Sequence, residues 1–161
     1  MHGRIDSLLS QAKLIWACAP ANYNASTSTD KYISLKNYDK VTIIILTGAW
    51  AAGTAAVTLT QATAVAGTGA KELAFDTYYH DETTSGTLVK TTATLNTFNL
   101  DTANKMYVIE VDAASLDAAG GFDCLTITVA SPGANDDYYG IMYALHGNRY
   151  ADPTPPTALL D

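Results

Sequence analysis

The feature that most restricts the fold is an apolar stretch within residues 32–50, YISLKNYDKVTIIILTGAW. Its second part, residues 41–47, is the most apolar and most β-branched run in the chain, and side chains branched at Cβ fit a pleated, buried surface. Asn37 and Asp39 supply turn chemistry just before it. A strand this apolar at a sheet edge would promote aggregation. The sequence therefore predicts two strands joined by a tight turn, with the second strand central in its sheet.

Turn signals divide the rest of the chain into further short strands. Residues 55–65 alternate between apolar and polar with period two, which predicts a half-buried strand. Residues 112–119 predict one or two helical turns anchored by Leu116. Further strand patterns lie at 71–79, 88–92, 95–100, 106–111, 122–130 and 138–146. About eight strands at this spacing indicate an all-β fold, an antiparallel β-sandwich that is jelly-roll-like. The strand order does not follow from one sequence.

The two ends of the chain differ from its middle. Residues 1–18 carry apolar side chains at approximately helical spacing, and Pro20 ends that pattern. We therefore expect a short helical or extended arm over residues 1–20, which packs on its own domain or reaches a neighbouring subunit. The β-sandwich domain follows at 21–150. Residues 151–161 form a proline-rich tail, which cannot be a central strand.

The composition excludes several classes of partner. The chain has 161 residues, enough for one domain, and only 16% of them are charged, against about 25% in an average domain. A net charge of −7, with the basic residues scattered, argues against binding to nucleic acid. The sequence shows no apolar run of membrane-spanning length and no signal-peptide pattern, so we expect no membrane partner. Cys18 and Cys124 are interpreted as small buried thiols, with a disulfide as the alternative.

No residue pattern predicts an active site. The three histidines, His2, His80 and His146, are far apart in the sequence, and no HExxH, GxSxG or CxxC motif occurs. We therefore expect no catalytic residue, no metal and no cofactor. The acidic residues that flank the short helical segment are Asp112, Asp117 and Asp123. Calcium binding is one interpretation of these carboxylates. Helix capping by Asp112 and ordinary surface charge are the simpler one.

Aromatic residues supply the candidate contact sites. Tyrosine combines a large rigid surface with a polar tip and is enriched at interfaces, although adjacent tyrosines in a strand place one ring in the core and one outside. The apolar N-terminal segment and the C-terminal tail supply further candidates. The candidate protein–protein contact residues are Leu8, Leu9, Ile15, Trp16, Trp50, Tyr78, Tyr79, Arg149, Tyr150, Pro153, Pro155 and Pro156.

Four blocks of the sequence resemble a family of small virion proteins of tailed bacteriophages. They are APANY at 19–23, residues 32–63, YVIEVDAASLDAAGGFDCLTITVASPG at 107–133, and the closing RYADPTPPTALLD. The resemblance runs along most of the chain, but its motifs are scaffold and turn residues. It implies a head decoration, or cement, protein that sits on the capsid surface of the virion after synthesis in the host bacterial cytoplasm. It also implies a homotrimer that bridges subunits of the major capsid protein.

Two other functions fit the same fold class. A carbohydrate- or receptor-binding module of a phage tail or fibre would present an aromatic platform, built from Trp50 or from the pairs Tyr78–Tyr79 and Tyr138–Tyr139. A cupin-type enzyme would need several histidines and a carboxylate converging on a metal, which three separated histidines do not predict.

Overall fold

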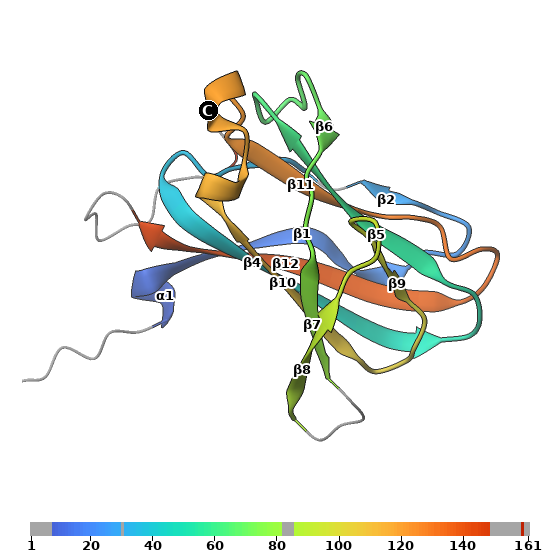
Figure 1. Cartoon of the computed structure of the whole chain (residues 1–161). Coiled ribbons are helices and arrows are strands. Elements are labelled where there is room, and N and C mark those ends of the chain that lie inside the picture. Colours follow the sequence, from blue (N-terminus) through green and yellow to red (C-terminus); the bar gives the residue numbers. More distant parts are fainter. Residues whose placement is uncertain (1–7, 30, 82–85, 149–158, 160–161) are drawn as a thin grey trace, which may run out of the picture.

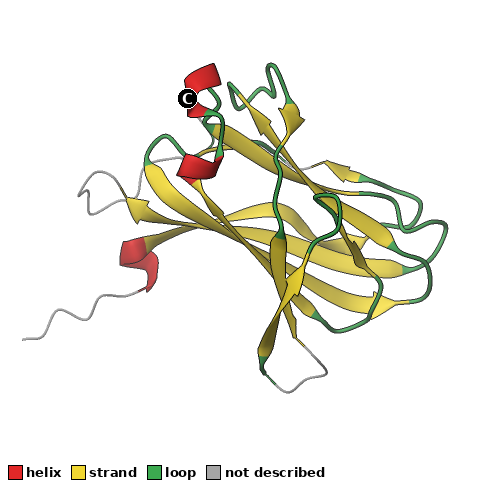
Figure 2. Ribbon diagram, in the orientation of Figure 1, coloured by secondary structure: helices red, strands yellow, loops and turns green. Residues whose placement is uncertain are grey.

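Strands make up more than half of the residues described by the computed structural model, which are 8–29, 31–81, 86–148 and 159 (Figures 1 and 2). The helical elements are α1 (Leu8–Gln11) and the 3-10 turns η1 (Ala113–Ser115) and η2 (Ala118–Gly120). The strands are β1 (Ala12–Asn22), β2 (Ser28–Thr29), β3 (Ile33–Ser34), β4 (Tyr38–Trp50), β5 (Ala55–Ala62), β6 (Lys71–Glu72), β7 (Thr77–Asp81), β8 (Leu88–Thr92), β9 (Phe98–Leu100), β10 (Met106–Asp112), β11 (Cys124–Val129) and β12 (Asp137–Asn148). The predicted all-β class is confirmed.

The strands form two antiparallel sheets that face each other across one core (Figure 1). Sheet A has the order β1-β12-β4-β10-β7-β8. Sheet B has the order β2-β11-β5-β6, with β3 also pairing with β11 and β9 also pairing with β5. Strands β2 and β3 therefore act as one interrupted strand along β11, as β6 and β9 do along β5.

This order is that of a jelly roll. When the interrupted strands are merged, β1-β12-β4-β10 faces β2/β3-β11-β5-β6/β9, and the merged strands follow two Greek keys. The chain changes sheet between consecutive merged strands, except from β5 to β6/β9, which are neighbours in sheet B. The β7–β8 hairpin is an addition, paired onto the β10 edge of sheet A. The predicted jelly-roll-like sandwich is confirmed. The pattern at 71–79, predicted as one strand, is divided, because β6 belongs to sheet B and β7 to sheet A.

Strand β4 occupies the centre of sheet A, as predicted for residues 41–47. It pairs with β12 on one side and with β10 on the other. Its inward residues Val41, Ile43 and Ile45 have no exposed surface, since sheet B covers them. The preceding turn does not make a hairpin, because β3 joins sheet B whereas β4 joins sheet A. The turn thus carries the chain from one sheet to the other.

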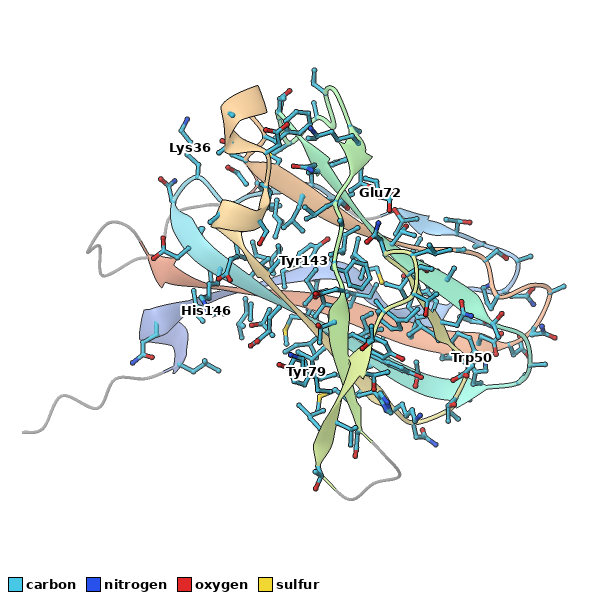
Figure 3. The ribbon with its side chains drawn as sticks, viewed as in Figure 1. Lys36, Trp50, Glu72, Tyr79, Tyr143 and His146 are labelled. Atoms are coloured by element: carbon cyan, nitrogen blue, oxygen red, sulfur yellow. The ribbon has the colours of Figure 1, made fainter. Side chains whose placement is uncertain are left out.

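One hydrogen bond crosses the core between the sheets. The backbone N–H of Ile127 in β11 donates to the hydroxyl of Tyr143 in β12 over 3.1 Å, and both residues are fully buried. Ile127 lies between the part of β11 that pairs with β3 and the part that pairs with β2. The tyrosine therefore satisfies a backbone donor at the point where the neighbouring strand is interrupted. Figure 3 shows Tyr143 between the two layers.

Of the two alternatives for the N-terminal arm, the extended one describes the chain from Ala12 onward and the helical one is wrong there. Only α1 is helical, and β1 follows it directly and pairs with β12. The predicted boundary at residue 20 falls inside this strand. The physical reason is that β12 offers an open edge, and pairing there packs Ile15 against the core while Trp16 points away from it. Tertiary pairing of this kind overrides local helical spacing. Residues 1–7 and the tail at 151–158 lie outside the described residues.

Substituting Tyr143→Phe should lower the free energy of unfolding by about 1–3 kcal/mol, because it leaves a buried N–H without its acceptor. Urea denaturation followed by circular dichroism would measure the change. Tyr79→Phe is a matched control, since Tyr79 is only half-buried on the far side of sheet A, and it should change the stability by less than about 0.5 kcal/mol. Equal effects in the two variants would contradict the role given to the inter-sheet bond.

An aromatic cluster fills the end of the core near β7 and β9. Tyr78 stacks on Phe98 with ring centroids 4.1 Å apart, and Phe98 stacks on Tyr107 at 5.6 Å. Burial, and to a lesser degree the nearby Asp101 carboxylate, raises the pKa of Tyr107 to about 12. Its proton is therefore held more tightly in the folded chain than in a solvent-exposed tyrosine, whose pKa is about 10.

The stability should consequently fall at alkaline pH. Because Tyr107 ionises at lower pH when the chain unfolds, its contribution is complete below pH 10 and is lost as the pH rises through about 12. Thermal unfolding between pH 8 and pH 12 should show a falling Tm. The decrease should be smaller in Tyr107→Phe, which has no proton to lose there. An identical pH profile in the variant would show that other groups cause the loss.

Candidate interaction surface

The outward side of sheet A carries a continuous row of large side chains. Residues directly opposite each other in antiparallel strands lie on the same face of a sheet. The pairing register places one residue from each strand in a single row, ordered Trp16, Met142, Ile44, Val108, Tyr79 and Lys90. Five of these six residues are apolar or aromatic, and they span the sheet from β1 to β7.

Neighbouring rows widen this surface. Leu14 flanks Trp16 on β1, Leu46 lies opposite Met106, and Tyr138 lies beside Gly48. We define the outer apolar face as Leu14, Trp16, Ile44, Leu46, Tyr79, Met106, Val108, Tyr138 and Met142. Trp16 is 56% exposed and Leu46 50% exposed. Large side chains with this much open surface, gathered on one face, are typical of a site that binds another macromolecule.

The two outer faces of the sandwich differ in chemistry. On sheet B, the register places Thr58 opposite Thr128 and Thr60 opposite Thr126 on the outward side, where all but the buried Thr126 are partly exposed. That is the usual arrangement of an antiparallel sheet with one face toward water. On sheet A, the corresponding outward positions of β4 are Ile44 and Leu46. Exposure to water alone therefore does not explain why apolar residues occupy these outward positions of sheet A.

A shallow hollow lies beside Leu46. It has a volume of about 250 Å³ and is lined by Pro20, Ala21, Leu46, Thr47, Gly48, Tyr138 and Tyr139. Pro20 closes one side by lying directly over Gly140, where an added Cβ would come within 2.8 Å of the proline ring. Any residue larger than glycine at position 140 would displace this part of β1. The hollow gives the outer apolar face a recess that an apolar side chain of a partner can enter.

The free edge of β1 is less suited to binding than the face. No described strand pairs with that edge. The register of β1 against β12 shifts between Trp16 and Cys18 and again between Cys18 and Ala21, and Pro20 lies in the second irregular part. Bulges and proline are features that protect edge strands from pairing with another chain. The face of the sheet is therefore a better candidate for a contact surface than its edge.

Charged groups border the outer apolar face. Lys40 and Asp112, at one end of the β4–β10 pair, form an ion pair of 3.0 Å, and Glu110 lies opposite Thr42. Lys90 ends the central row on β8. An apolar centre with a charged border is the usual composition of a protein–protein interface.

The structure brings together some of the predicted contact residues and separates others. Trp16 and Tyr79 share the central row, and Leu8 is exposed on α1. Ile15 packs inward on the core. Trp50 (labelled in Figure 3) also packs against the core, and its Nε1 donates to the carbonyl of Gly53 over 3.1 Å. The side chain of Leu9, and the residues Arg149, Tyr150, Pro153, Pro155 and Pro156, lie outside the described part of the chain.

The adjacent tyrosines behave as predicted. Tyr78 packs into the aromatic cluster while Tyr79 lies in the outer row, and Tyr139 is buried while Tyr138 is exposed. Five members of the outer apolar face were not among the predicted contact residues, namely Ile44, Leu46, Met106, Val108 and Met142. The signal that could have found them is the uninterrupted apolar run in β4, because a strand that is apolar at consecutive positions is apolar on both faces.

Each of the two described histidines has a threonine hydroxyl beside its Nε2 atom, and the buried Nδ1 of His80 has no hydrogen-bond partner among the described residues. His80 Nε2 lies 3.1 Å from Thr91 Oγ1, and His146 Nε2 lies 3.0 Å from Thr42 Oγ1. Among the described residues, no group of three or more His, Cys, Asp or Glu side chains could hold a metal ion. Cys18 and Cys124 are buried thiols that form no disulfide, as predicted. No described helix is long and apolar enough to span a membrane.

The predicted capping role of Asp112 is wrong. Its side chain makes no capping hydrogen bond to η1 and pairs with Lys40 instead. Asp117 caps η2, since its carboxylate accepts from the backbone N–H of Gly120. A hydrogen bond from Lys71, together with this capping bond, lowers the pKa of Asp117. The Asp117 carboxylate therefore stabilises the η2 turn.

Comparisons with known proteins give only remote likenesses. No protein-family model matches the chain, and no curated protein sequence matches it. The crystal structure of the SPBc2 prophage-derived protein YomS is similar with a TM-score of 0.46 and 11% identity, covering 83% of this chain and 92% of that chain. A structure described as Bacillus endospore appendages, a family of disulfide-linked pili, has a TM-score of 0.39 and 12% identity, with 86% and 89% covered. Neither likeness assigns a function to this chain.

Substitution of two neighbouring residues of β4 should change the free energy of unfolding by very different amounts. Ile45→Ala should cost about 2–5 kcal/mol, because it leaves a cavity in the core. Leu46→Lys should change the stability by less than about 0.5 kcal/mol, because the side chain points into solvent. Chemical denaturation of both variants would measure this. A large loss of stability in Leu46→Lys would show that the outer apolar face is covered within the folded chain.

Proposed function

We propose that this chain is a non-enzymatic structural protein of a tailed-phage virion, which decorates the capsid and stabilises it. In this proposal the outer apolar face docks onto the major capsid protein. The observation that carries the proposal is the contrast between the two outer faces, threonine-lined on sheet B and apolar on sheet A. The resemblance of the sequence blocks to phage virion proteins supplies the identity of the partner.

The proposed mechanism is linkage between binding and assembly. A protein that binds only the assembled capsid lattice stabilises the lattice by mass action. We further propose that the chain acts as a homotrimer that bridges neighbouring capsid subunits. Several weak contacts made at once then give a high total affinity. The jelly roll is a rigid body in this proposal. A rigid body loses little conformational entropy when it docks, which favours binding.

The direct experiment is co-sedimentation of the purified protein with capsids of the encoding phage assembled without it. Leu46→Lys should weaken capsid binding by at least about tenfold, because it places a charge at the centre of an apolar contact. Leu95→Lys is the matched control. It makes the same change at an exposed leucine outside sheet A, and capsid binding should be unchanged.

Two results would contradict the proposal. Wild-type protein that does not sediment with capsids would remove the proposed partner. Equal binding by wild type and Leu46→Lys would show that the contact lies elsewhere on the molecule. Quantifying bound copies at saturation tests the trimer separately, since a trimer at each local threefold position fixes the ratio of the two proteins.

A further inference from the structure

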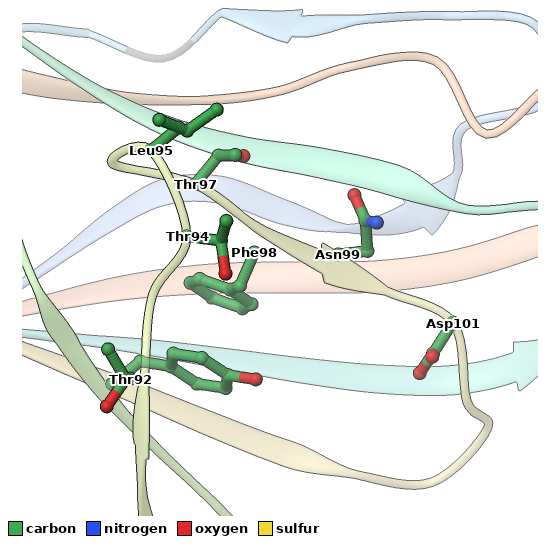
Figure 4. Close-up of a pocket in the computed structure, with 8 residues that line it drawn as sticks. Thr92, Thr94, Leu95, Thr97, Phe98, Asn99 and Asp101 are labelled. Atoms are coloured by element: carbon green, nitrogen blue, oxygen red, sulfur yellow. The ribbon is translucent and has the colours of Figure 1, made fainter.

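A second hollow lies away from the outer apolar face, where the chain passes from β8 in sheet A to β9 in sheet B (Figure 4). Its volume is about 450 Å³. The residues that line it are Tyr78, Thr92, Thr94, Leu95, Thr97, Phe98, Asn99 and Asp101. Figure 4 shows Asn99 and Asp101 toward one end and Thr94 and Leu95 toward the other, with Phe98 between them.

One wall of the hollow is aromatic and rigid. Tyr78 and Phe98 stack almost parallel, with an angle of 9° between their rings, and Tyr107 supports Phe98 from within the core. Phe98 is only 6% exposed, whereas Tyr78 is partly open to the hollow. The wall is thus an apolar surface fixed in position by the aromatic cluster.

Several polar side chains in the hollow can form further hydrogen bonds. The side chains of Thr92, Thr94 and Asn99 are exposed and form no hydrogen bond within the described part of the chain. The Oδ1 atom of Asp101 accepts from Thr102 Oγ1 at 2.7 Å and lies 3.5 Å from the Tyr107 hydroxyl. These bonds leave Oδ2 of Asp101 as a further acceptor. Hydroxyl and amide groups both donate and accept, so the site suits a ligand with alternating donors and acceptors.

The turn at the rim is strained. Thr94 and Thr97 exchange both backbone hydrogen bonds, at 3.0 and 3.1 Å, and so enclose a two-residue turn. Leu95 and Asn96 both have positive φ, 52° and 58°. Asparagine tolerates this conformation, but leucine does not favour it. Leu95 is nevertheless 89% exposed, so folding gains nothing from its side chain. A strained backbone that presents an exposed apolar side chain points to a contact outside the chain.

The strained turn is also firmly anchored. Asn96 Nδ2 donates to Glu72 Oε1 of β6 over 2.7 Å, and Thr97 Oγ1 donates to the carbonyl of Val57 in β5 over 2.9 Å. Leu95 is therefore held at the rim by sheet B, while Tyr78 is held by sheet A. A site whose walls are fixed before binding loses little entropy when a ligand enters.

We propose that this hollow binds a neutral pyranose sugar. A pyranose ring has C–H groups on one face and hydroxyl groups around its rim. The C–H face fits against Tyr78 and Leu95, and the hydroxyl groups pair with Thr92, Thr94 and Asn99. The Asp101 carboxylate accepts from sugar hydroxyls and repels acidic sugars, which selects neutral ones. The site shares no residue with the outer apolar face, so it adds a second binding activity to the proposed structural function.

The test is saturation-transfer NMR on the full chain with the methyl glycosides of glucose, galactose, mannose and N-acetylglucosamine. At least one should receive magnetisation from the protein. Asn99→Ala should weaken binding of that glycoside by about tenfold, because the sugar loses a paired amide. Leu95→Gly should weaken it as well, while raising Tm, since glycine adopts positive φ without strain. Leu46→Lys should bind the sugar like wild type.

Three outcomes would overturn this proposal. The first is absence of transfer to all of these glycosides. The second is unchanged binding in both Asn99→Ala and Leu95→Gly. The third is loss of binding in Leu46→Lys, which would locate the sugar on the outer apolar face. None of these results bears on capsid co-sedimentation, so the two proposals fail separately.

Discussion

The fold depends on how strand β4 is covered. Its apolar residues occupy consecutive positions, so the strand needs partners at both edges and apolar contact on both faces. Strands β12 and β10 cover its edges, and sheet B covers Val41, Ile43 and Ile45. The remaining face carries Ile44, which is partly buried, and Leu46, which is half exposed. The same sequence run that determines the core therefore also produces the surface on which a partner is proposed to dock.

The crossing hydrogen bond between Ile127 and Tyr143 shows how the two sheets are held in register. An interrupted strand leaves backbone donors without a neighbour, and a buried donor without an acceptor is costly. A tyrosine from the opposite sheet reaches across the core and supplies the acceptor. The sandwich can therefore interrupt its edge strand between β2 and β3 without leaving a buried polar group unsatisfied at this position.

Local pattern predicted those parts of the structure in which the two faces of a strand differ. The alternation in β5 gave its buried residues Val57 and Leu59 correctly, and Leu116 anchors the turn region as expected. Strand β1 was misjudged because its pairing partner, β12, lies at the other end of the chain. The outer apolar face was not predicted for the same reason, since it also depends on long-range pairing. Trp16, Met142, Ile44 and Val108 come to lie in one row only through the register of four separate strands.

The first and last strands of the described fold lie side by side, with Ala12 opposite His146. The chain therefore enters and leaves the sandwich at the same corner of sheet A. A pulling force applied through the two ends would break the hydrogen bonds between β1 and β12 one after another, starting at the pair Ala12 and His146. A force applied across the sheet would instead be shared by all its strands. The domain is thus mechanically weak along its termini, and peeling β1 away as far as its second half would uncover the buried thiol of Cys18.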